Sequence, residues 1–149
     1  METKTTSVLN ELIEINNDRV AGFEKAIADI KDENIDLKGL FQRYAAQSRE
    51  NSQELAALVG AEGDDVETGT SVSGSLHRAW IDVKSVFDGS TRESILSEAE
   101  RGEDAIKKAY REALEDTELS ATVRETITRQ QSGINAAHDE VKTLRDASK

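Results

Sequence analysis

Glutamates and histidines are the residues of this chain whose types and spacing could hold a metal ion. Glu100 and Glu103 lie three residues apart, and so share one face of a predicted helix. Glu103 falls on the apolar seam itself, which is the stripe of apolar residues along the helix face that packs inward. A buried carboxylate at such a position needs a cation, a donor or a proton. Glu24 and His77 stand beside the seams of two other predicted helices. The candidate metal ligands are therefore Glu24, His77, Glu100 and Glu103.

The pattern typical of a di-metal bundle is nevertheless incomplete. Such a bundle presents Glu-x-x-His on two helices, because that spacing aims a carboxylate and an imidazole at one ion. The chain has two histidines, and the residues three positions before His77 and His138 are Gly74 and Asn135. Glu-x-x-His therefore does not occur. This gap makes iron or manganese binding the alternative hypothesis rather than the leading one.

Polar residues also interrupt the apolar seams near a common level. Antiparallel pairing of the first two helices sets Asn16 against Asn51 and Val20 against Ser48. Burying an amide costs a few kcal/mol, roughly, unless it is hydrogen-bonded. Such a layer can fix the helix register, hold a metal or ligand, or face a partner subunit or a wet cleft. The predicted polar core layer consists of Asn16, Ser48, Asn51 and Gln130.

The elements that position these residues are predicted from hydrophobic periodicity. Apolar residues recur every three or four positions, which is typical of amphipathic helices, and proline is absent. A short link at residues 31–34 turns the second helix back against the first. Gly60 is expected to stop the second helix, and Ser90 and Ser120 to cap the last two. We predict one all-α domain over residues 1–149, with helices at about 6–30, 35–59, 75–88, 91–115 and 121–146.

Composition narrows the possible functions. A formal charge of −11 repels nucleic-acid phosphates and anionic membranes, so neither is an expected partner. The absence of cysteine excludes disulfides and thiolate catalysis. No nucleophile-plus-base pattern is visible in the sequence. The first residues lack the basic region and apolar core of a signal peptide, and no apolar run reaches membrane-spanning length, which predicts a cytoplasmic location.

Four stretches over roughly residues 8–115 read LNELIEINNDRVAGFEKA, LKGLFQRYAAQSRENSQEL, SGSLHRAW and SEAERGEDAIKKAYREAL. In these stretches the chain resembles a bacterial family of unknown function in the ferritin-like superfamily. The most specific portions are Ser73–Trp80 and Ala99–Tyr110. The resemblance implies a ferritin-like antiparallel four-helix bundle, with the short helix as an additional element in the crossover region. It implies no established activity.

The resemblance also implies a comparison with the metal sites of the wider superfamily, which bind two iron or manganese ions through inward Glu and His. Where the first helix would carry a ligand glutamate, residues 19–24 read RVAGFE, which leaves only Glu24. Ser48 and Asn51 stand where the second helix would carry Glu-x-x-His. The fold implied by the resemblance therefore comes with a degenerate metal site, and a fold does not by itself supply chemistry.

Three functional interpretations follow. The leading one is a non-enzymatic ferritin-like bundle that acts as a stress-related or scaffolding interaction protein. It would bind a protein partner or form a homodimer, because five helices in one small domain should leave apolar surface exposed. The alternative is a carboxylate-bridged di-metal protein that binds iron or manganese. A third, weaker interpretation is a small-molecule pocket beside Trp80 and His77.

Overall fold

The computed structural model of the protein describes residues 4–30, 32–61, 63 and 91–148. These residues form four α-helices and a short 3-10 turn, η1 (Asp32–Asn34), and no β-strand occurs among them. The helices are α1 (Lys4–Asp29), α2 (Ile35–Ala61), α4 (Arg92–Ala113) and α5 (Ala121–Ala147). None of these helices is long and apolar enough to cross a membrane. The short helix expected at residues 75–88 lies outside the described part of the chain.

The observed helix ends differ from the expected ones by at most two residues, and α2 and α5 begin at the expected residues. Gly60 does not stop α2, which continues to Ala61, and the positive φ of 80° occurs instead at Gly63. Ser90 was the expected N-cap of α4, but the cap is Thr91, whose hydroxyl accepts from the backbone N–H of Ser94 at 3.2 Å. The helix can start there because Thr91 has the extended conformation that an N-cap requires. Ser120 caps α5 as predicted.

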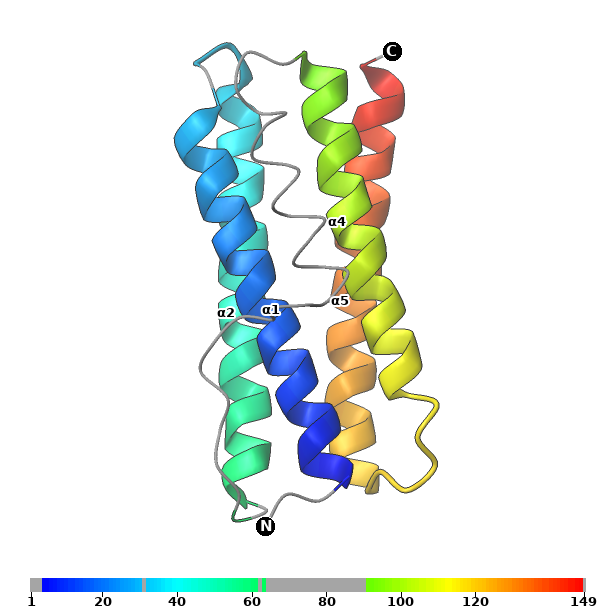
Figure 1. Ribbon diagram of the computed structural model, residues 1–149. Helices are drawn as coiled ribbons and strands as arrows, with labels where there is room; N and C mark the ends of the chain where they lie inside the picture. The colour runs from blue at the N-terminus through cyan, green and yellow to red at the C-terminus, as the bar shows by residue number, and fades with distance from the viewer. Residues whose placement is uncertain (1–3, 31, 62, 64–90, 149) are drawn as a thin grey trace.

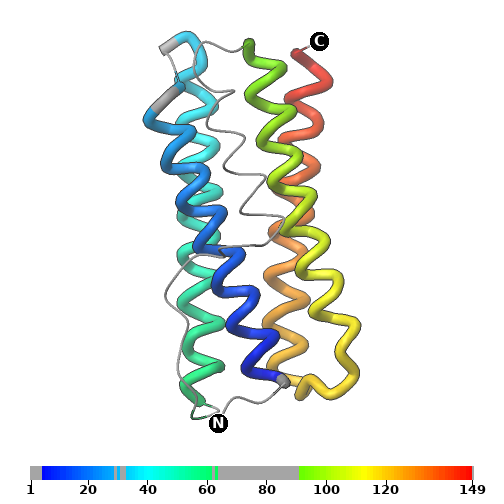
Figure 2. Tube along the Cα trace, in the orientation of Figure 1, coloured from blue at the N-terminus to red at the C-terminus, as the bar shows by residue number. Residues whose placement is uncertain are grey.

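The four helices form two antiparallel hairpins that lie side by side, α1 with α2 and α4 with α5 (Figure 1). The tube view shows that α1 and α5 run in one direction and α2 and α4 in the other (Figure 2). The start of α4 therefore lies beside the start of α2, where Nη1 of Arg92 donates to Oδ1 of Asp36 at 2.9 Å. Consequently α2 and α4 are parallel, although they are consecutive among the described helices.

Aromatic rings and amides fix the register of the first hairpin. The ring of Phe23 on α1 lies 4.9 Å from that of Phe41 and 5.5 Å from that of Tyr44, measured between centroids. Nδ2 of Asn51 donates to Oδ1 of Asn16 at 3.4 Å. The predicted pairing of Asn16 with Asn51 is therefore confirmed, since the two amides meet at the same level of the bundle.

One seam position of α1 differs from the prediction. Arg19 is fully buried, whereas Val20 is only half-buried. Position 19 is three residues after Asn16 and four before Phe23, so it fits the seam spacing as well as position 20 does. Val20 was the predicted seam residue because it is apolar. The structure places the guanidinium inside, because Glu103 faces it there from α4.

Candidate functional site

A buried ion pair lies at the centre of the bundle. Arg19 on α1 and Glu103 on α4 both have 0% exposed side chains. Nε and Nη2 of Arg19 donate to Oε1 and Oε2 of Glu103, each at 2.8 Å. This two-point pairing of a guanidinium with a carboxylate is among the strongest hydrogen-bonded arrangements in proteins, and it uses both carboxylate oxygens.

The remaining side of the guanidinium is satisfied by α2. Nη1 of Arg19 donates to Oε1 of Gln47 at 2.7 Å and to Oγ of Ser48 at 3.0 Å. The rings of Phe23 and Tyr44 lie 5.4 and 5.3 Å from the guanidinium carbon, within the range of cation–π attraction. A buried ion pair repays its desolvation only when its other groups are hydrogen-bonded too. The bonds to Gln47 and Ser48 meet this condition for Arg19.

A second hydrogen-bond network, made of uncharged side chains, reaches from α1 to α5. Nδ2 of Asn16 donates to the hydroxyl of Tyr110 at 2.8 Å, and this hydroxyl donates to Oε1 of Gln130 at 2.8 Å. Nε2 of Gln130 lies 3.3 Å from the backbone oxygen of Asn51, which closes the circuit on α2. Each amide therefore has a partner from another helix, and the network ties all four helices together.

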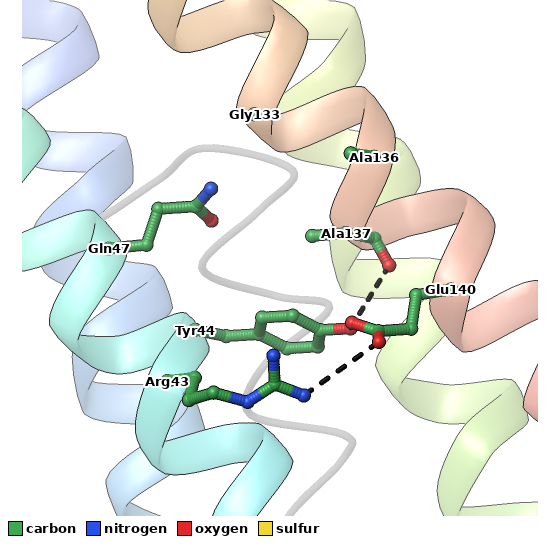
Figure 3. Close-up of a pocket in the computed structure, with 7 residues that line it drawn as sticks. All are labelled: Arg43, Tyr44, Gln47, Gly133, Ala136, Ala137 and Glu140. Atoms are coloured by element: carbon green, nitrogen blue, oxygen red, sulfur yellow. Dashed lines mark hydrogen bonds and ion pairs between the residues drawn. The ribbon is translucent and has the colours of Figure 1, made fainter.

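Tyr44 extends the polar layer to the surface between α2 and α5. Its hydroxyl donates to Oε1 of Glu140 at 2.5 Å and lies 3.3 Å from the backbone oxygen of Ala137 (Figure 3). Burial raises the pKa of Tyr44 far above its ordinary value, and the Glu140 carboxylate raises it further. Burial likewise raises the pKa of Tyr110.

The two shifted tyrosines predict how the protein responds to alkali. Their pKa values are raised above the ordinary 10.0, so they stabilise the fold fully below pH 10, and this contribution is lost as the pH rises further. Tyr44 and Tyr110 are the only tyrosines of the chain. Tyrosinate ultraviolet absorbance should therefore stay absent just above pH 10 and appear together with loss of helical circular dichroism.

The control is the chain in denaturant, whose tyrosines should ionise near pH 10. Tyrosinate absorbance that appeared near pH 10 while the helical signal stayed intact would contradict the buried placement of both hydroxyls.

An open pocket of about 380 Å³ lies on the α2–α5 side of this layer. Figure 3 shows Gln47 and Tyr44 on one wall and the α5 residues on the other. Gly133 leaves room for Gln47, because a Cβ at position 133 would lie 2.8 Å from Nε2 of that side chain. The pocket is lined by Arg43, Tyr44, Gln47, Gly133, Ala136, Ala137 and Glu140.

Gln47 links the pocket to the ion pair, because it lines the pocket and accepts a hydrogen bond from Arg19. Replacing Gly133 with alanine tests this link. Alanine should gain about 1 kcal/mol of helix propensity. It should also displace Gln47 and weaken a charge-assisted hydrogen bond that contributes about 1.5–3 kcal/mol. We therefore expect a net loss of about 1 kcal/mol in the free energy of unfolding, measured by urea denaturation.

Two controls isolate the cause. Gly39→Ala, on an exposed position of α2 where a Cβ meets nothing within 4 Å, should stabilise the protein. In a Gln47→Ala background, Gly133→Ala should become stabilising as well. A Gly133→Ala variant as stable as Gly39→Ala would show that Gln47 is not held in place.

The structure places the three described metal-ligand candidates apart from one another. Glu103 is committed to Arg19, whereas Glu24 is about half exposed and pairs with Arg49 on the surface of the first hairpin. Glu100 pairs with Arg145, whose Nη1 lies 2.7 Å from Oε1. His77 lies outside the described residues. Among the described candidates, Glu24, Glu100 and Glu103 do not converge on one point, because each carboxylate is paired with a different arginine.

The predicted polar layer is brought together. Its four members are buried, and their hydrogen bonds run through two residues that the sequence reading did not assign to the layer, Arg19 and Tyr110. The sequence contained an indication that Arg19 is buried. A glutamate on the apolar seam requires a cation, and position 19 fits the three- and four-residue spacing of the seam of α1. The members are Asn16, Ser48, Asn51 and Gln130.

These central donors do not fit a transition-metal ion. The fully buried carboxylate at the bundle centre, Glu103, has both oxygens on the guanidinium. The fixed positive charge of Arg19 would repel a second cation at the same place. The amides and the hydroxyl that complete the layer are poor ligands for iron or manganese.

Comparison with known protein families identifies most of the chain. A family model described as Domain of unknown function (DUF2383) matches residues 4–116, a range that includes α1, α2 and α4. No curated protein matches the sequence.

Proposed function

The chain belongs to the DUF2383 family, and on that premise we propose that it is a non-enzymatic ferritin-like bundle acting as a stress-related or scaffolding interaction protein in the cytoplasm. The single observation that carries the proposal is the Arg19–Glu103 pair, in which a guanidinium stands at the bundle centre. The centre then serves stability rather than chemistry, and the metal site is degenerate. The directions of the helices support the ferritin-like assignment, because ferritin-like bundles join two parallel helices by one long crossover.

The partner that this proposal implies is a protein with a basic surface. The expectation of exposed apolar surface is not met in the described residues, where Ile35, at 66% exposure, is the only large hydrophobic side chain that is strongly exposed. A net charge of −11 instead favours basic partners and opposes self-association at low salt. A homodimer is the competing arrangement, and sedimentation across protein and salt concentrations decides between them: a salt-independent dimer would overturn the basic-partner proposal.

Metal content tests the degenerate site directly. The full chain, purified without chelator, should contain far less than one equivalent of iron or manganese. Stoichiometric iron or manganese that disappears in the double variant Arg19→Met/Glu103→Leu would instead establish the alternative, a carboxylate-bridged metal protein. The double variant matters because it removes the central carboxylate and guanidinium together.

A gain-of-function variant sharpens this test. Arg19→Glu would set two carboxylates against each other at the bundle centre, which a divalent cation could neutralise. We expect Mn²⁺ to raise the melting temperature of Arg19→Glu by more than it raises that of the wild type. Arg19→Gln is the matched control, because it removes the guanidinium without adding a ligand carboxylate. Equal responses of Arg19→Glu and Arg19→Gln to Mn²⁺ would count against a metal-site geometry at this position.

A further inference from the structure

A second group of ionisable side chains lies between α4 and α5, outside the central layer. Glu100 and Asp104 are four residues apart on α4, and so share a helix face. His138 reaches them from α5, and one ligand atom from each of the three lies within 4.8 Å of the others. His138 is 8% exposed, whereas Asp104 is exposed, so the group is buried on one side and open to solvent on the other.

The imidazole of His138 faces a carboxylate at each ring nitrogen. Nε2 lies 2.6 Å from Oδ1 of Asp104, and Nδ1 lies 3.2 Å from Oδ1 of Asp139. A neutral imidazole has one N–H and can donate to only one of them. Its other nitrogen would then present a lone pair to a carboxylate oxygen. A metal ion on Nε2 would remove this conflict, because Nδ1–H could then donate to Asp139.

Glu100 offers a third donor to such an ion. Its Oε1 accepts from Arg145, while its Oε2 is buried and has no hydrogen-bond partner. A buried acceptor without a partner is costly. A metal ion bound by all three residues would satisfy it.

We propose that Glu100, Asp104 and His138 bind one divalent transition-metal ion, with Zn²⁺ the ion that these donors suit best. Zinc binds imidazole nitrogen and carboxylate oxygen, and a site with three protein ligands leaves the fourth tetrahedral position open. Asp139 would act as the positioning residue, because a carboxylate on Nδ1 fixes the tautomer that leaves Nε2 free for metal.

The donor positions require a small adjustment to bind the ion. Tetrahedral zinc holds its nitrogen and oxygen ligands about 3.3 Å apart, given bond lengths of about 2.0–2.2 Å. Asp104 must therefore move slightly away from His138, and Glu100 must move closer. Asp104 can do so because its side chain is 60% exposed.

Calorimetric titration of the metal-free full chain with zinc chloride near neutral pH tests the proposal. We expect one Zn²⁺ per chain, affinity at least about tenfold weaker in His138→Gln, and about 10–100-fold weaker in Asp139→Asn. Nitrogen NMR of the histidine ring should show Zn²⁺ shifting Nε2 of His138. His77→Gln is the matched control, since it removes the chain's other histidine and should leave binding unchanged.

Two results would overturn the site. One is unchanged affinity in His138→Gln. The other is a His138 ring whose nitrogen resonances do not change when Zn²⁺ is added. Zn²⁺ binding that persists in Arg19→Met/Glu103→Leu would show that this peripheral site is independent of the bundle centre. Failure of the zinc proposal is therefore distinguishable from failure of the proposed function.

Discussion

Arg19→Met is expected to destabilise the protein by about 3–5 kcal/mol, because it leaves a buried carboxylate without its cation. Glu103 has no exposed surface, and both of its oxygens are paired with Arg19. A domain of this size is stable by about 5–15 kcal/mol, so the variant would lose a large part of its stability. Urea denaturation followed by helical circular dichroism at neutral pH measures the change.

The double variant Arg19→Met/Glu103→Leu shows whether the lost stability comes from the stranded charge. Two apolar side chains of similar volume should restore most of it, since replacing a whole buried ion pair is often neutral or stabilising by about 1–4 kcal/mol. Arg92→Met is the surface control, because the Arg92–Asp36 pair is largely exposed and such pairs contribute about 0–1 kcal/mol. A double variant as unstable as Arg19→Met would contradict the assigned role of the pair.

Tyr110→Phe is expected to have the second-largest effect, a loss of about 2–4 kcal/mol. Two buried groups lose a partner at about 1–3 kcal/mol each, and the loss stays in the lower part of the summed range because Nδ2 of Asn16 keeps its bond to the backbone oxygen of Leu12. The hydroxyl accepts from Asn16 and donates to Gln130, and the side chain is fully buried. The same urea denaturation measures the change. Phenylalanine keeps the ring, so the loss reports the hydroxyl alone.

Tyr44→Phe is the matched control for this prediction. Its hydroxyl bonds to Glu140, whose side chain is 44% exposed and can turn to water when the hydroxyl is removed. The effect should therefore be smaller than that of Tyr110→Phe. The reverse order would mean that the stabilising network lies at the α2–α5 surface rather than at the centre.

Local pattern was enough to predict much of this fold. Helical periodicity and the lack of proline predicted the four described helices to within two residues at each end. The short turn at η1 made α1 and α2 antiparallel neighbours, so the opposition of Asn16 and Asn51 followed from counting residues outward from it. These features depend on contacts close in sequence, where spacing alone determines which side chains meet.

The candidate sites needed information that spacing does not contain. Arg19 and Val20 fit the seam equally well, and only the carboxylate of Glu103, 84 positions away, selects the arginine. The group of Glu100, Asp104 and His138 likewise forms only when α5 packs against α4. The sequence did not connect His138 with Glu100 and Asp104, because these two carboxylates lie on a different helix.

By itself, the sequence determined that the chain is helical, where the described helices lie, and which level of the first hairpin is polar. The tertiary structure decided which charged side chains enter the interior and which carboxylates meet a histidine. The physical reason is that helical periodicity leaves a choice between neighbouring seam positions. A charged residue is buried at one of these positions only when an oppositely charged partner faces it, and the packing of the helices brings that partner close.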